Sequence, residues 1–197
     1  MTWIPMPRLN PAPVIKRRGR RIISFRKKDD RFGWMGNMPH FEVEHQSVKY
    51  KSSEHLFQSL RYKGHPRIQR QIRGHPNSLY MKKTVHRRSV HLIAPLDPKQ
   101  DKERMLVCLR AKVAAHPWMA KRLVATGNAM IIENVSRRPR GSGKVWGAAW
   151  DRRRKEWQGH NWLGRLWMKL RAELCRSVRI RANDAARRRL PKRPSCP

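Results

Sequence analysis

The sequence predicts one compact α+β domain that is mostly helical and carries a basic extension at each end. Segments with helical periodicity outnumber the short apolar strands, and 197 residues suit a single domain with extensions. Apolar residues make up 39% of the chain and include eight tryptophans, which is enough for a real core. The predicted boundaries are a Pro- and Arg-rich extension at 1–21, the domain at 22–175 and an Arg-rich tail at 176–197.

The first part of the domain is expected to contain two strands and then a helix that carries polar side chains. β-branched and aromatic residues favour strands at 21–25 and 40–44, separated by a loop that contains Gly and Asn. A helix at 53–62 should follow, because one of two adjacent serines can cap it and apolar residues recur at helical spacing. Glu54 falls in the first turn of this helix, where the helix dipole favours a carboxylate.

Helices dominate the rest of the domain. Apolar residues at helical spacing predict the longest clear helix at 99–115 and a last helix at 161–175. The other expected elements are a short helix within 65–76, a helical segment from 117 to 124, a strand at 129–134, and a strand or loop at 144–150.

The charge of the chain indicates a polyanionic partner. It has 47 Lys and Arg residues against 13 Asp and Glu residues, a formal net charge of +34. Nucleic acid relieves this self-repulsion, since each neutralised phosphate releases a condensed counterion. Arginine outnumbers lysine, which suits bidentate phosphate contacts and stacking on bases. We therefore expect nucleic-acid binding, with RNA favoured over DNA.

Basic clusters identify the residues expected to bind RNA. Four consecutive cations lie between Trp150 and Trp157, and these tryptophans, like Trp3 and Trp34, could stack on bases or fill protein interfaces. The alternative for the stretch 150–162 is a solvated loop with Trp157 in the core. The expected RNA-binding residues are Arg17, Arg18, Arg20, Arg21, Arg152, Arg153, Arg154, Lys155, Arg187, Arg188 and Arg189.

Other classes of site find little support in the sequence. Three scattered cysteines make no disulfide framework, and the nine histidines lack metal-ligand spacing, so neither a metal nor a cofactor is expected. No apolar run is long enough to span a bilayer. The acid-free, Arg-containing N-terminal extension is compatible with import into mitochondria or another organelle, with the cytoplasm or a nucleoid as alternatives.

Four ordered motifs resemble the NADAR family. They are "SSEHLFQSLRY", "ATGNAMIIEN", "VWGAAW" and "GHNWLGRLWMKLRAEL", and the loop before the first motif resembles the family's Ser-Asn-Phe segment, with Asn37 at the Asn position. The resemblance covers about residues 22 to 175. It implies a compact, mainly helical α+β fold and an ancestral N-glycosidase that cleaves an N-ribosyl bond, on substrates such as ADP-ribosylated guanine or phosphorylated riboflavin intermediates.

The resemblance also implies which residues would perform the chemistry. Glu54 is the family's catalytic carboxylate, and Asn37, Trp146, Gly147 and Asn161 would help to line the pocket. The family's lysine, whose amine can form a Schiff base with the opened ribose, is replaced by Arg61, and arginine cannot do amine chemistry. The family's Asp after Trp-Gly is replaced by Ala148. These departures favour a vestigial site in which Glu54 pairs with Arg61 or another arginine.

Two functions remain open at this point. The favoured one is a non-catalytic NADAR-like domain that binds RNA as a structural component of a large ribonucleoprotein, most naturally an organellar ribosome, with rRNA and neighbouring proteins as partners. The alternative is an active N-glycosidase that removes ADP-ribose from guanine in nucleic acid, or cleaves a related N-ribosyl bond. Only the alternative requires a small ADP-ribosyl substrate in the pocket.

Overall fold

The computed structural model describes residues 13–15, 19–95, 97–138 and 142–189. In chain order the elements are β1 (Val14–Ile15), β2 (Ile22–Phe25), η1 (Gly33–Met35), β3 (Val43–His45), β4 (Val48–Tyr50), α1 (Ser53–Arg61), α2 (Pro66–Gly74), α3 (Ser78–Ser89), η2 (Val90–Leu92), α4 (Pro98–Ala115), α5 (Pro117–Val124), β5 (Met130–Glu133), α6 (Gly143–Trp146), β6 (Ala149–Asp151), β7 (Glu156–Gln158) and α7 (Trp162–Arg189). The predicted fold class, a mostly helical α+β domain, is confirmed.

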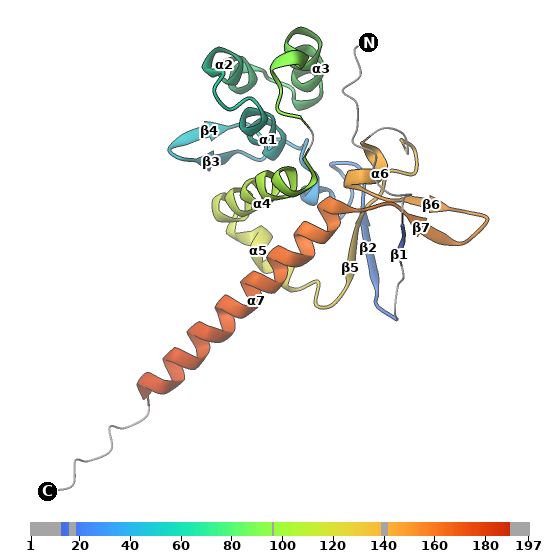
Figure 1. The fold of residues 1–197 in the computed structure, drawn as a ribbon. Coiled ribbons are helices and arrows are strands. Elements are labelled where there is room, and N and C mark those ends of the chain that lie inside the picture. The colour runs from blue at the N-terminus through green and yellow to red at the C-terminus, as the bar shows by residue number, and fades with distance from the viewer. Residues whose placement is uncertain (1–12, 16–18, 96, 139–141, 190–197) are drawn as a thin grey trace, which may run out of the picture.

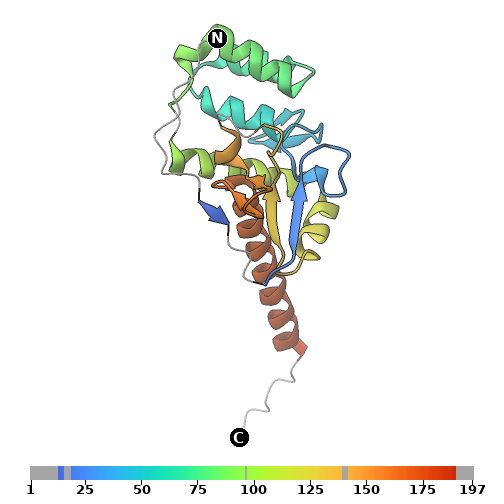
Figure 2. The same cartoon turned by 90° about the vertical axis from the view of Figure 1, so that its right-hand side faces the viewer.

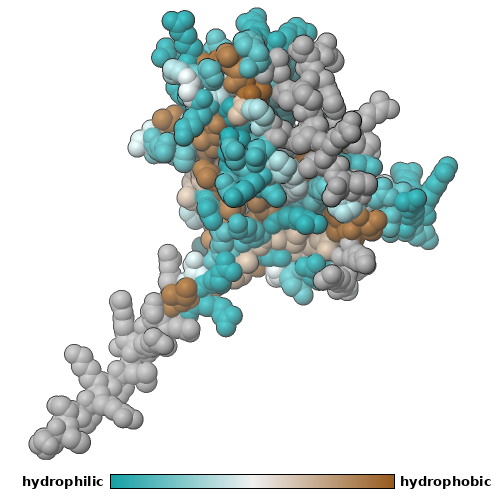
Figure 3. Space-filling view, in the orientation of Figure 1, coloured by the Kyte–Doolittle hydropathy of each residue, from teal (hydrophilic) through white to brown (hydrophobic). Residues whose placement is uncertain are grey.

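Helix α7 separates two layers of the domain. In Figures 1 and 2, α1 to α5 lie on one side of it and most of the strands on the other. The N-terminal half of α7 packs against β5, α4 and α5, while its C-terminal half extends away from the rest of the domain (Figure 1). The side chains of Val178 and Ile180 on this projecting part are exposed. Much of the coloured surface in Figure 3 is hydrophilic.

The strands form three small sheets. β2 and β5 pair in parallel with Ile22 opposite Met130, which brings the ends of two distant segments together. The second sheet is antiparallel in the order β1-β7-β6, so part of the predicted N-terminal extension is a strand of the domain. β3 and β4 form a separate hairpin. Such short sheets need a packed helical layer for stability.

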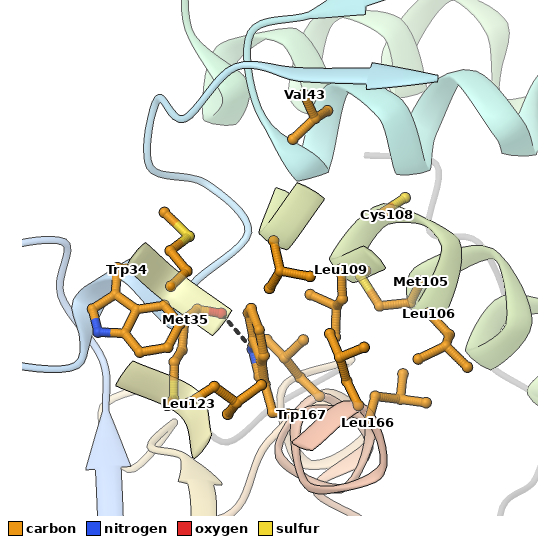
Figure 4. Close-up of a cluster of buried hydrophobic side chains, with 14 of the residues drawn as sticks. Trp34, Met35, Val43, Met105, Leu106, Cys108, Leu109, Leu123, Leu166 and Trp167 are labelled. Carbon is orange, nitrogen blue, oxygen red and sulfur yellow. Dashed lines mark hydrogen bonds between the residues drawn. The ribbon is translucent and has the colours of Figure 1, made fainter. Parts of the chain in front are cut away.

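One large apolar cluster holds the helices α1, α4, α5 and α7 to strands β2 and β5. Leu109 of α4, Leu123 of α5 and Leu166 of α7 belong to this cluster, and Figure 4 shows them around Trp167. Trp167 is fully buried among them, and its Nε1–H donates to the carbonyl of Met35 at 2.8 Å. This bond satisfies the one polar atom of a large aromatic side chain and fixes η1 against α7.

Lys112 of α4 fixes the same segment from the other side. Its ammonium is buried and donates to the carbonyls of Trp34 at 2.6 Å and Gly36 at 2.7 Å, and it lies 5.0 Å from the centre of the Phe41 ring. Burial lowers the pKa of Lys112 to about 7. The two carbonyls belong to residues just before Asn37, so this lysine helps to fix the backbone that leads to Asn37 in the candidate site.

Several sequence predictions differ from the structure. The predicted strand at 40–44 is instead a hairpin that starts at Val43, because the positive φ angles at its tip reverse the chain. The segment 144–150 divides into α6 and β6, and the last helix continues from 175 to Arg189. Helix α3 was not predicted at all. Trp34 is a core residue packed edge-on against Trp167, so the expectation that it stacks on bases is wrong.

Candidate active site

The start of α1 places a carboxylate at a helix N-terminus. The Ser52 side chain caps the helix by accepting from the His55 amide, and the Glu54 amide donates to the carbonyl of Asn37 at 3.1 Å. His55 is anchored at both ring nitrogens: Nδ1 lies 2.8 Å from Ser52 Oγ, and Nε2 donates to the carbonyl of His75. These bonds fix the first turn of the helix, and the helix dipole favours the Glu54 carboxylate there.

Helix α3 supplies one partner to Glu54 and one to Gln58, which itself binds Glu54. Glu54 is only 4% exposed; its Oε1 accepts from Gln58 Nε2 at 2.8 Å and lies 3.5 Å from Lys82 Nζ. Gln58 Oε1 accepts from His86 Nε2 at 2.9 Å. Burial lowers the pKa of His86 to about 4, with help from the positive charge of Lys82. His86 is therefore neutral near pH 7 and carries its proton on Nε2, which fixes the orientation of the Gln58 amide.

A second carboxylate approaches Glu54 from the sheet. Glu133 is the last residue of β5, and its Oε2 is buried without a hydrogen-bond partner among the described residues. Burial and, to a smaller extent, the negative charge of Glu54 raise the pKa of Glu133 to about 7, against the lowering effect of Lys82 and Arg138. Two carboxyl groups held in such different environments can serve as base and acid of one reaction.

Both carboxyl groups line one pocket of about 250 Å³. Phe57 and Trp146 form an aromatic wall with their rings edge-on at 5.3 Å, and Asn37 lines the same pocket. Asn37 Nδ2 donates to the sulfur of Met105, while its Oδ1 is buried without a partner among the described residues. Lys82 and Arg138 add two cations to the lining. A ligand with hydroxyl or N–H donors would satisfy the unpaired oxygens of Asn37 and Glu133.

Arg61 does not belong to this pocket. Its Nη2 donates to the carbonyl of Ala94 at 2.7 Å, and its Nε lies 3.7 Å from Asp101 Oδ1, which also binds Arg104 at 2.7 Å. Arg61 and Asp101 are both buried. The expected ion pair of Glu54 with Arg61 is therefore wrong: Lys82 takes that place, and Arg61 joins α1 to α4.

Three other residues expected at the site lie behind it. A Cβ on Gly147 would come within 2.4 Å of the Glu133 carbonyl, so a glycine is required for the close approach of this segment to β5. Ala148 is fully buried, and its amide donates to the same carbonyl. Asn161 donates to the carbonyl of Ile131 and accepts from the Glu133 amide. These residues support the strand that presents Glu133 and do not line the pocket.

A family model matches most of the chain. The NADAR domain model matches residues 24–175, which is most of the chain and nearly the predicted domain. The chain belongs to the NADAR family. The solved NMR structure of the E. coli protein YbiA is similar to this NADAR domain with a TM-score of 0.63 at 24% identity, covering 80% of this chain and 87% of YbiA. That similarity supports the fold alone. No curated protein sequence matches significantly.

The site of this NADAR domain contains residues that sequence reasoning missed. Lys82 and His86 come from α3, whose start is marked by the Asn77 side chain accepting from the amides of Leu79 and Tyr80. Met81 and Val85, four residues apart and both buried, carry the matching helical signal. Glu133 belongs to a quoted motif, but the sequence reasoning gave it no role.

The basic residues expected to bind RNA are spread over the domain. Arg152, Arg153, Arg154 and Lys155 form the exposed tip of the β6–β7 hairpin, where Trp150 and Trp157 pack against each other at 5.4 Å. Arg20 is half-buried and Arg21 exposed. Arg187, Arg188 and Arg189 lie at the end of α7. Arg17, Arg18 and Trp3 lie outside the described residues.

Metal and membrane sites find no structural support in the described parts of the chain. No group of three His, Cys, Asp or Glu side chains there could hold a metal ion. No helix in those parts is long and apolar enough to cross a membrane.

Proposed function

We propose that the protein is an N-glycosidase that hydrolyses an N-ribosyl bond, with ADP-ribosylated guanine in nucleic acid as its substrate. The observation that carries the proposal is the meeting of Glu54 and Glu133 in one pocket, one beside an ammonium group and the other with a pKa of about 7. A vestigial site would have no need to keep a second carboxyl group half-buried with one oxygen that has no partner among the described residues, because this costs stability.

The two carboxyl groups take different parts in the reaction. As the bond between the ribose C1′ and the base nitrogen breaks, positive charge develops on the sugar, and the Glu54 carboxylate stabilises it. Glu133, whose raised pKa of about 7 lets it carry a proton near neutral pH, donates that proton to the leaving base nitrogen. Water then adds to C1′ and loses a proton to the Glu133 carboxylate, so the products are unmodified guanine in the nucleic acid and ADP-ribose with a hydroxyl at C1′.

The remaining lining residues suit a ribosyl group. A volume of about 250 Å³ is below the roughly 300–1,000 Å³ of pockets for drug-sized ligands, which favours entry of the sugar end of a larger substrate. The unpaired Asn37 Oδ1 can accept from a ribose hydroxyl. Lys82 offsets the charge of Glu54 and, like Arg138, can attract the phosphates attached to the ribose.

The test is release of ADP-ribose from an ADP-ribosylated oligonucleotide, which leaves unmodified guanine in the strand. The wild type should release ADP-ribose, and Glu54→Gln and Glu133→Gln should each reduce kcat/KM by about 10²–10⁴-fold. Glu103→Gln removes an exposed carboxylate elsewhere and serves as the control. No release by folded wild-type protein, or unchanged release by either pocket variant, would overturn the proposal.

A second candidate function is structural RNA binding in a large ribonucleoprotein such as an organellar ribosome. It is favoured by the net charge of +34 and by the four consecutive exposed cations at the hairpin tip. The test is a sucrose gradient of cell extract at about 150 mM salt, where exposed charges are partly screened. Co-migration with ribosomal subunits would support this candidate, and a small free species would refute it.

A further inference from the structure

A second pocket has a volume of about 320 Å³. Arg21, Arg31 and Arg122 line it together with Phe32 and Trp34. The segment from Arg31 to Met38 contributes to both pockets, since Asn37 and Met38 line the carboxylate pocket. The two pockets share no lining residue, and no carboxylate lines the second one.

The three arginines converge from separate parts of the chain. Arg21 precedes β2, Arg31 lies in the loop before η1, and Arg122 is in the last turn of α5. All three side chains are exposed, and none forms an ion pair with a carboxylate in the part of the chain that the structure describes. Three like charges in one pocket repel each other unless an anion binds between them.

Trp34 adds a buried donor to this pocket. It is 5% exposed, and its Nε1–H has no acceptor among the described residues. In Figure 4 the ring nitrogen of Trp34 lies on the side away from Met35 and Trp167, whereas Trp167 uses its own nitrogen within the core. An indole nitrogen can only donate a hydrogen bond, so its missing partner is an acceptor atom.

A buried arginine makes the floor of the pocket more positive. Arg171 of α7 is 8% exposed and donates to Thr126 Oγ1 at 2.6 Å and to the carbonyl of Ala129 at 2.9 Å. Thr126 lines the pocket, so the Arg171 guanidinium lies one side chain behind it. Both bonds go to neutral oxygens, and the charge of Arg171 is left uncompensated by them.

An exposed aromatic platform borders the pocket. Trp118 is 38% exposed, and its ring contacts Trp34 edge-on at 5.8 Å. The Arg122 guanidinium lies 5.0 Å from the centre of the Trp118 ring, which holds both side chains at the rim. Arginines beside an exposed tryptophan match a phosphate followed by a base, because bases stack on aromatic rings without regard to sequence.

We propose that this pocket binds a backbone phosphate of a single-stranded nucleic acid between Arg21, Arg31 and Arg122, with the neighbouring base stacked on Trp118. The geometry assigns the acceptor missing at Trp34 Nε1 to a phosphate oxygen. This site does not depend on the proposed glycosidase activity, since it shares no side chain with the carboxylate pocket.

The experiment compares two variants of equal charge. The full-length triple variant Arg21→Gln/Arg31→Gln/Arg122→Gln empties the pocket of cations, and Arg67→Gln/Arg70→Gln/Arg87→Gln removes three exposed cations from α2 and α3. Affinity for a fluorescent single strand of roughly 12 nucleotides is measured at about 150 mM salt. We expect about a tenfold loss for the pocket variant and about a twofold loss for the control. Equal losses would overturn the proposal.

A second measurement follows the Trp34 indole directly. In ¹⁵N–¹H spectra of the wild type, the Trp34 Nε1–H resonance is assigned with Trp34→Phe and followed during titration with the same single strand. It should shift as the strand binds, and Trp118→Ala should weaken binding without abolishing this shift. A Trp34 resonance that does not move refutes the site. Saturation by inorganic phosphate alone, with no response to the strand, would mean a small-anion site and would also refute it.

Discussion

Replacing Glu133 by Gln should stabilise the protein, and the gain should appear only at neutral and alkaline pH. Burial and the charge of Glu54 raise the pKa of Glu133 from 4.5 to about 7. The folded protein therefore binds this proton more tightly than the unfolded chain does. Its contribution to stability is complete below pH 4.5 and is lost as the pH rises to about 7.

The magnitude follows from the two pKa values. Their difference corresponds to about 3 kcal/mol, because each pKa unit is worth about 1.36 kcal/mol. Above pH 7 the ionised Glu133 thus costs the folded state about this amount. A glutamine cannot ionise, so Glu133→Gln should raise the free energy of unfolding by about 2–3 kcal/mol at pH 8 and by close to nothing at pH 4.5.

Urea unfolding followed by tryptophan fluorescence at pH 4.5 and pH 8 measures this difference. Glu103→Gln removes an exposed carboxylate and should show no such pH dependence. In a Glu54→Gln background the gain from Glu133→Gln should shrink, since the charge of Glu54 is one cause of the raised pKa. An equal effect at both pH values, or destabilisation at pH 8, would refute the argument that Glu133 is buried with an unfavourable charge.

Three further predictions test neighbouring contacts. Lys82→Gln should lower kcat/KM for ADP-ribose release by about 10–100-fold, whereas Lys82→Arg should retain most of it, because Lys82 acts through its charge beside Glu54. Equal losses in the two variants would contradict this. Arg61→Met should reduce the free energy of unfolding by about 2–3 kcal/mol, since Asp101 keeps its ion pair with Arg104, yet steady-state assays should show unchanged release of ADP-ribose. Lys112→Met should cost about 1–3 kcal/mol by orphaning two carbonyls, and melting curves should show a larger loss at pH 9 than at pH 6. The wild type gains stability as the pH rises from about 7 toward 10.5, because the folded-state pKa of Lys112 is lowered.

The sequence by itself determined the family, the fold class and most of the helices. The ordered motifs "SSEHLFQSLRY" and "VWGAAW" carried the resemblance, and regular apolar spacing predicted α1, α4 and the N-terminal part of α7 close to their observed bounds. It also indicated that Glu54 lies in the first turn of α1. These features depend on contacts between residues near each other in the chain, and local spacing therefore reveals them.

Only the tertiary structure decided what surrounds Glu54. Arg61 follows Glu54 by two helical turns, but the Asp101 carboxylate and the Ala94 carbonyl draw its side chain to α4, which spacing along α1 could not reveal. Lys82 reaches Glu54 from a helix that the sequence analysis overlooked, and Glu133 comes from a strand whose partner is more than a hundred residues earlier. Electrostatic interactions are strong in the low-dielectric interior, so the pKa and the orientation of a buried charged group are set by the partners that packing places beside it. Those partners come from distant segments of the chain, which local sequence patterns do not reveal.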